Sequence, residues 1–138
     1  MKIHARLLPA LAAAFVLPAL AHHSGAMFDD TKTQTLSGKV VEFNWRNPHS
    51  SFKVEVTDAA GKAVIWDVEM NTPQNLVLQG WKRTSLKKGD QVTAVVRPLR
   101  NGLPGGSYVS IKLADGTVLN GSGPGDNLGN AASAPGTR

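Results

Sequence analysis

The strongest constraint on the fold is a short alternation of apolar and polar residues that recurs along the middle of the chain. A period of two is typical of half-buried β-strands. Residues 51–57 and 63–70 both show it and flank a turn at residues 58–61, so we expect a hairpin. The side chains expected to point inward are Phe52, Val54, Val56, Val64, Trp66, Val68 and Met70.

The strand before this hairpin, at residues 35–45, is expected to be strongly curved. Its apolar face changes parity after Val40, which indicates a bulge or a sharp coil near that residue. The residues on the first parity are Leu36, Gly38 and Val40, and those on the second are Val41, Phe43 and Trp45.

One short helix is predicted after the hairpin. Asn71 or Thr72 is a suitable N-cap, Pro73 suits the first helical position, and Gly80 is expected to end the helix. Three further strands follow at residues 91–99, 108–113 and 117–119, separated by turns rich in glycine and asparagine.

This order of elements predicts an all-β fold. Three strands, a short helix and then further strands, with a coiled first strand, are typical of a small OB-like barrel of five to six strands. A β-sandwich is the alternative, although a seven-stranded sandwich needs more strands than the sequence provides.

The N-terminus has the features of a cleavable signal peptide. Lys2 and Arg6 precede an apolar run at residues 7–20, and Ala19-Leu20-Ala21 fits the rule for cleavage between small residues. The run is shorter than the roughly 18 residues that a membrane-spanning helix needs. We therefore expect residues 1–21 to be removed, a periplasmic protein that begins at His22, and no stable membrane insertion after cleavage.

The remaining sequence predicts one folded domain at residues 22–119 and a flexible tail at residues 120–138. The tail is rich in Gly, Asn, Ser, Ala and Pro and has little to bury. Cysteine is absent, which excludes disulfides and thiolate metal sites. The formal charge of +5 includes the two basic residues of the signal peptide, and the other Lys and Arg residues are scattered. We therefore expect no nucleic-acid partner.

The histidines suggest a copper site. Cleavage after Ala21 would leave a free amine on His22, and this amine and the ring Nδ1 of the same residue form a chelate suited to Cu(II). His23 adds a second imidazole, and His49, in an Asn-Pro turn, is a third candidate. Met27 could add a thioether that favours Cu(I), and Asp29 or Asp30 a weak oxygen ligand.

Simpler interpretations of the same residues remain open. His22 and His23 could be a mobile processed terminus, and His49 a turn histidine bonded to local backbone. Met27 and Phe28 could be an apolar pair that packs an N-terminal arm on the barrel.

The other candidates concern surface binding and catalysis. Trp45, at the end of the first strand beside Arg46, is the best exposed aromatic candidate for a binding surface. The acidic residues of the strands fall on the outward parity, as expected for a solvated sheet face: Glu42, Glu55, Asp67 and Glu69. No catalytic triad, nucleophile elbow or phosphate-binding glycine loop is present, so we predict no catalytic residues and no enzyme.

Several segments together resemble a known family. They are Ala21-His22-His23-Ser24, Met27-Phe28-Asp29, Asn47-Pro48-His49-Ser50, Gly80-Trp81 and residues 86–90, Leu-Lys-Lys-Gly-Asp. The combination resembles a family of small exported bacterial proteins known only as a domain of unknown function. The resemblance implies a periplasmic protein with a barrel-like β fold, and it implies no catalytic residues. In its first residues the mature chain is also similar to exported copper proteins in which an N-terminal histidine binds the metal.

Two hypotheses about function follow. The first is a small exported non-enzymatic protein that binds Cu(II) through His22, His23 and His49. The second is an OB-like module that binds a protein, a peptide or a glycan on its curved face around Trp45. A copper oxidase is less favoured, because so short a chain leaves little room for a substrate platform.

Overall fold

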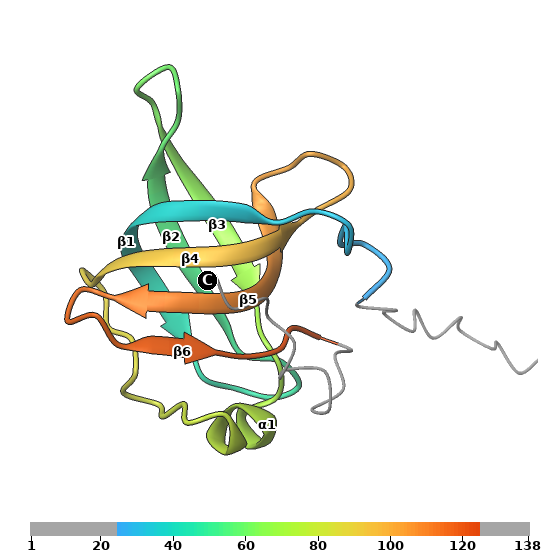
Figure 1. Cartoon of the computed structure of the whole chain (residues 1–138), viewed down its shortest axis with the longest axis vertical. Coiled ribbons are helices and arrows are strands. Elements are labelled where there is room, and N and C mark those ends of the chain that lie inside the picture. The colour runs from blue at the N-terminus through green and yellow to red at the C-terminus, as the bar shows by residue number, and fades with distance from the viewer. Residues whose placement is uncertain (1–24, 125–138) are drawn as a thin grey trace, which may run out of the picture.

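The computed structural model describes residues 25–124. One six-stranded sheet in the order β3-β2-β1-β4-β5-β6 closes on itself through a parallel pairing of β3 with β5 (Figure 1). The first five strands therefore form the barrel, and β6 pairs along the second half of β5. The elements are β1 (Gln34–Asn44), β2 (Ser51–Thr57), β3 (Ala63–Glu69), α1 (Pro73–Leu78), β4 (Gln91–Pro98), β5 (Gly105–Leu113) and β6 (Val118–Asn120).

This topology confirms the all-β, OB-like prediction. A five-stranded barrel in which β3 meets β5 in parallel, with a helix between β3 and β4, is the OB arrangement. The alternative of a β-sandwich is wrong, because the strands close into one barrel. Within the described residues, no helix has the length and apolar character that crossing a membrane requires.

The curvature of β1 arises where the sequence indicated it. The register between β1 and β2 shifts between Val40 and Glu42, as a bulge requires. Gly38 pairs with β2 on one side and with β4 on the other, because β1 belongs to both halves of the barrel. A Cβ atom at Gly38 would lie 2.0 Å from the backbone oxygen of Glu55, so only glycine fits this crossing.

The core fills the barrel with the inward residues of all five strands. Phe52, Val54 and Val68 of the hairpin are completely buried, and Trp81 and Tyr108 pack edge to face with ring centroids 5.4 Å apart. The β2–β3 hairpin extends past the other strands at one end of the barrel, and α1 lies at the opposite end (Figure 1).

The short helix α1 forms as predicted. The side chain of Thr72 accepts a hydrogen bond from the Asn75 backbone, Pro73 occupies the first turn, and Gly80 follows with a φ of +86°. Such a positive φ is strained for other residues, which explains why the chain leaves the helix at this glycine.

β5 begins earlier than the sequence suggested. The prediction started this strand at Tyr108, whereas it runs from Gly105, and it is residues 105–107 that pair with β3 and close the barrel. A Cβ atom at Gly106 would lie 2.7 Å from the backbone oxygen of Arg97. Gly105 and Gly106 therefore permit close strand packing, although the sequence around them is typical of a loop.

The folded region also extends beyond residue 119. Asn120 ends β6, and the next four residues form a segment that we call the C-terminal strap (residues 121–124). Ser122 is 2% exposed, and its hydroxyl accepts hydrogen bonds from the side chains of Asn71 at 3.0 Å and Gln79 at 2.7 Å. The predicted start of a flexible tail at Asn120 is therefore wrong for residues 120–124. The rest of the predicted tail and the predicted signal peptide lie outside the described residues.

Candidate functional site

A groove runs along one side of the barrel between the N-terminal arm (residues 25–33) and two loops. Its volume is about 930 Å³. The arm contributes Met27 and Phe28, the β1–β2 loop residues 46–49, β3 Asp67 and Glu69, and the β4–β5 region Leu99 and residues 103–106. We call this concavity the loop groove.

The N-terminal arm is fixed beside the loop groove by backbone pairing. Phe28 forms an isolated β-bridge with Leu99, and the backbone oxygen of Met27 accepts a hydrogen bond from Arg100. The arm lies next to the β4–β5 loop in Figure 1. Phe28 is 3% exposed, so it packs on the barrel as one interpretation predicted, whereas Met27 is 49% exposed and lines the groove.

His49 occupies the loop groove together with Glu69. Its ring Nδ1 lies 2.6 Å from the carboxylate Oε1 of Glu69, and both side chains are about one-third exposed or less. The peptide bond before Pro48 is cis, and the turn expected at Asn47-Pro48 precedes this histidine. His49 follows a bend at Asn47-Pro48, and the hydrogen bond of its ring is to the carboxylate of Glu69 on β3 and not to local backbone.

Asp29 does not line the loop groove, and its carboxylate makes local contacts instead. Its carboxylate accepts hydrogen bonds from the hydroxyl of Thr31 at 2.6 Å and from the Thr31 backbone, and Lys32 lies 3.1 Å away. The hydrogen bonds from Thr31 and then Lys32 lower the pKa of Asp29 to about 2. The neighbouring Asp30 lies 3.8 Å from Arg97. These contacts stabilise the turn at the end of the arm.

The two surface-binding candidates have different surroundings. Arg46 is exposed and lines the loop groove. Trp45 packs edge to face on Phe43, with centroids 5.9 Å apart, and its backbone oxygen accepts from Arg83. Trp45 is therefore partly buried against the core, and of the two candidates it is Arg46 that lines the loop groove.

The structure thus brings together three of the predicted residues, namely Met27, Arg46 and His49. His22 and His23 lie outside the described residues. Between residues 25 and 124, no group of three or more His, Asp, Glu or Cys side chains could hold a metal ion.

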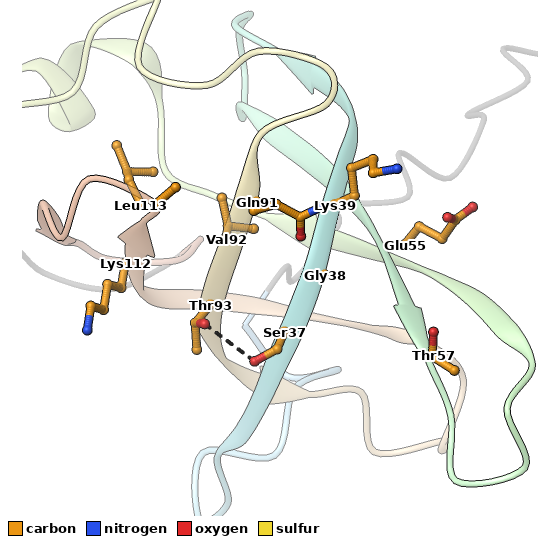
Figure 2. Close-up of a pocket in the computed structure, with 11 residues that line it drawn as sticks. Ser37, Gly38, Lys39, Glu55, Thr57, Gln91, Val92, Thr93, Lys112 and Leu113 are labelled. Carbon is orange, nitrogen blue, oxygen red and sulfur yellow. Dashed lines mark hydrogen bonds between the residues drawn. The ribbon is translucent and has the colours of Figure 1, made fainter.

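A second concavity lies at the other ends of β4 and β5 and has a volume of about 640 Å³ (Figure 2). The backbone of Gly38 lies in its wall, and Ser37 and Thr93 share a hydrogen bond there. Its charged side chains are exposed, and those of Lys39 and Lys112 point in different directions. None of the predicted site residues lines this cleft, and it offers no converging set of ligands.

Glu69 is the groove residue that the sequence interpretation missed, because its outward parity suggested a solvated face. The hairpin register contained the necessary information. In this hairpin Thr57 pairs with Ala63, and the same register places Ser51 opposite Glu69. His49 lies two residues before Ser51 and is therefore a diagonal neighbour of Glu69 on the same face.

The fold is also similar to that of a solved protein. The match is to the mitochondrial single-stranded DNA-binding protein Rim1 from S. cerevisiae, with a TM-score of 0.46 and 12% sequence identity over 65% of this chain and 96% of that chain. The OB-like assignment rests on the strand order described above and not on this similarity. No curated protein matches the sequence.

The sequence matches the profile of a family described as a family of unknown function, DUF6152, over residues 10–108. This match includes the arm, the β1–β2 loop with His49, and the barrel as far as Tyr108. It confirms the resemblance drawn from the sequence segments. The chain therefore belongs to DUF6152, a family of unknown function.

Proposed function

We propose that this protein is a small, exported, non-enzymatic binding protein that holds a copper ion between its processed N-terminus and His49. One observation carries the proposal. His49 is held by Glu69 in the same groove that receives Met27 of the docked arm. An imidazole and a thioether, both copper ligands, thus lie where the arm approaches the barrel.

The N-terminal histidines supply the remaining ligands in this proposal. His22 is three residues before Gly25, and an extended chain of that length spans about 10 Å. Cleavage after Ala21 would give the amine and the Nδ1 of His22 as a chelate, with His23 beside it. Nitrogen ligands of this kind favour Cu(II), which has the highest affinity among the divalent first-row metals.

Export is part of the proposal, because the chelate requires cleavage by a signal peptidase. The charged start, the apolar run at residues 7–20 and Ala19-Leu20-Ala21 support a periplasmic location.

The experiment is a Cu(II) titration of protein purified from the periplasm, with the N-terminal residue confirmed by mass spectrometry. We expect sub-micromolar binding and a nitrogen-rich EPR spectrum. A variant with Gly-Ser inserted before His22 is the control, because it keeps every side chain and removes the terminal chelate. Equal affinity of the two proteins, or binding weaker than micromolar, would contradict the copper proposal.

A second candidate function is favoured by the position and size of the loop groove. OB folds bind oligomeric ligands on the face of β2 and β3 between the β1–β2 and β4–β5 loops, and this groove occupies that region. About 930 Å³ is also more than one metal ion requires. The protein would then bind a protein, a peptide or a glycan, with Arg46 and Leu103 at the contact.

The two candidates differ in a ¹H–¹⁵N NMR titration. Short peptides and oligosaccharides should shift groove resonances in copper-free protein if the second candidate is correct, and Leu103→Asp should abolish those shifts. If only copper perturbs the groove, the second candidate fails.

A further inference from the structure

We propose that the open edge of β3, at residues 63–66, is a docking site for an extended peptide in which apolar and basic residues alternate. The peptide adds a strand to the sheet and points its apolar side chains into a cleft beside the hairpin. Such binding needs no metal ion. Its apolar contacts lie on the inner face of β3, whereas the loop groove lies on the outer face.

β3 has a neighbouring strand on both sides only in its second half. The whole of β3 pairs with β2. On the other side β5 begins at Gly105, opposite Asp67, and pairs with residues 67–69 only. Within the part of the chain that the structure describes, residues 63–66 therefore have a strand on one side alone. They lie toward the tip of the hairpin, where it extends past the other strands (Figure 1).

The backbone N–H and C=O groups of Ile65 point away from β2. The Asp58 N–H donates to the Lys62 oxygen, and bonded pairs recur at every second residue of an antiparallel ladder, so β3 bonds to β2 through its even-numbered residues. The odd-numbered residues face the other way, and the Asp67 N–H accordingly donates to the Pro104 oxygen at 3.3 Å. The two backbone groups of Ile65 match the backbone of an extended peptide.

The open edge lacks the features that usually protect an edge strand. Residues 63–66 are Ala-Val-Ile-Trp, with no proline, no charged residue and no bulge among them. The side chain of Ile65 is 50% exposed on the outer face. An unprotected apolar edge is a template for pairing with another strand.

The inner side of the open edge borders a cleft of about 600 Å³, which we call the hairpin cleft. Val64 and Trp66 of β3 line it together with Leu36 of β1 and Pro104 of the β4–β5 loop. Trp66 is half-buried there. Because side chains alternate between the two faces of a strand, every second side chain of a docked peptide points toward this cleft. Apolar residues at those positions fit its lining.

The charges on the outer face determine the other half of the peptide. Glu55 lies directly opposite Ile65, and Asp67 follows Ile65 on the same face of β3; both carboxylates are exposed. Lys53, opposite Asp67, binds Glu42 at 2.9 Å. Among the described residues, no ion pair joins Glu55 to a cation. Lysine or arginine at the outward positions of the peptide therefore complements this face.

The first measurement is amide hydrogen exchange of the wild type by NMR, with and without a capped hexapeptide that alternates valine and lysine. In the free protein Ile65 should exchange rapidly, while Val64 and Trp66, bonded to β2, exchange slowly. Excess peptide should slow exchange at Ile65 by at least about tenfold. An Ile65 amide that is already protected in the free protein, or that the peptide leaves unchanged, overturns the inference.

The second measurement is the affinity of the same peptide for two variants. Ile65→Pro removes the outward N–H and keeps the bonds to β2, as proline on a strand edge can. It should weaken binding by at least about tenfold, whereas Ile65→Thr, which keeps the N–H, should stay within about threefold of the wild type. Circular dichroism checks both folds. Equal affinity of Ile65→Pro and the wild type would show that the edge is not used.

Two other results would also contradict the docking site. Sedimentation velocity without peptide should show a monomer, and a dimer that Ile65→Pro dissociates would assign the edge to a second copy of the chain. Peptide-induced shifts confined to Met27 and Leu103 would favour the loop groove instead. Because all these samples are free of metal, failure of the copper proposal leaves this inference intact, and the reverse also holds.

Discussion

Gly38 occupies the point at which β1 passes from one half of the barrel to the other. Its missing side chain is a steric requirement, because a Cβ atom would meet the backbone of Glu55 and not the movable end of a side chain. Gly38 also lines the cleft of Figure 2.

Substitution of Gly38 tests this requirement. We expect Gly38→Ala to lower the free energy of unfolding by about 1–3 kcal/mol, as overpacking against a backbone atom does. Urea denaturation measures the change. Ser37→Ala, at the adjacent exposed position, should change stability by no more than about 0.5 kcal/mol. Equal stability of Gly38→Ala and wild type would show that β1 can move away from β2 at this point.

Asp29 gives the arm a dependence on pH. Its pKa is lowered from the usual 3.8 to about 2 by the hydrogen bonds from Thr31 and Lys32, so folding favours the ionised form. The stabilisation is complete above the unfolded pKa and is lost as the pH falls through the folded pKa. The relevant window is therefore from about pH 4 to pH 2.

The comparison of wild type with Asp29→Asn isolates this contribution. We expect the wild type to have the higher Tm at pH 5–7, with a constant difference, and the two values to converge between about pH 4 and pH 2. Differential scanning calorimetry at several pH values checks this. A difference that persists unchanged to pH 2 would mean that the charge of Asp29 is not responsible.

At the scale of elements, the C-terminal strap seals the barrel next to α1. Gly121 would place a Cβ atom 2.2 Å from the Tyr108 ring, and Ser122 joins Asn71 to Gln79. Tyr108 is itself completely buried, and burial raises its pKa. Gly121 lets the chain lie directly on this ring, and the Ser122 hydroxyl accepts hydrogen bonds from the buried Asn71 amide and the partly buried Gln79 amide.

Two truncations test the strap. A chain that ends at Asn120 should be less stable than one that ends at Pro124 by about 2–4 kcal/mol, because Tyr108 is uncovered and the Asn71 and Gln79 amides lose an acceptor. Guanidinium denaturation of the two shortened proteins gives the difference directly. If both unfold at the same denaturant concentration, the strap does not stabilise the barrel.

The elements with regular alternation could be predicted from the sequence. The hairpin, the parity change of β1 at Val40 and the helix after Thr72 each depend on local patterning, turn residues or caps, and all three form as expected. The start of β5 and the strap could not be predicted in this way. Their glycines resemble loop or linker residues, and their close approach to Arg97 and Tyr108 exists only in the folded chain.

In the whole molecule, residues of the candidate site could be predicted from the sequence, but their arrangement in space could not. His49 and Met27 were identified by residue type, but their presence in one groove depends on the arm pairing with Leu99 and on barrel closure. Asp29 was a candidate metal ligand and Trp45 a candidate surface-binding residue, yet the fold uses the first in a turn and packs the second on Phe43. Residue type alone carries no information about these long-range contacts.

The most direct test of the copper site is a ¹H–¹⁵N NMR spectrum recorded with substoichiometric Cu(II), because the unpaired electron broadens resonances near the ion. We expect loss of signals from Met27, His49 and Glu69, while those of Thr93 and Lys112, at the opposite ends of β4 and β5, remain. Broadening confined to the residues before Gly25, or centred on the cleft of Figure 2, would contradict a copper ion held between the N-terminus and His49.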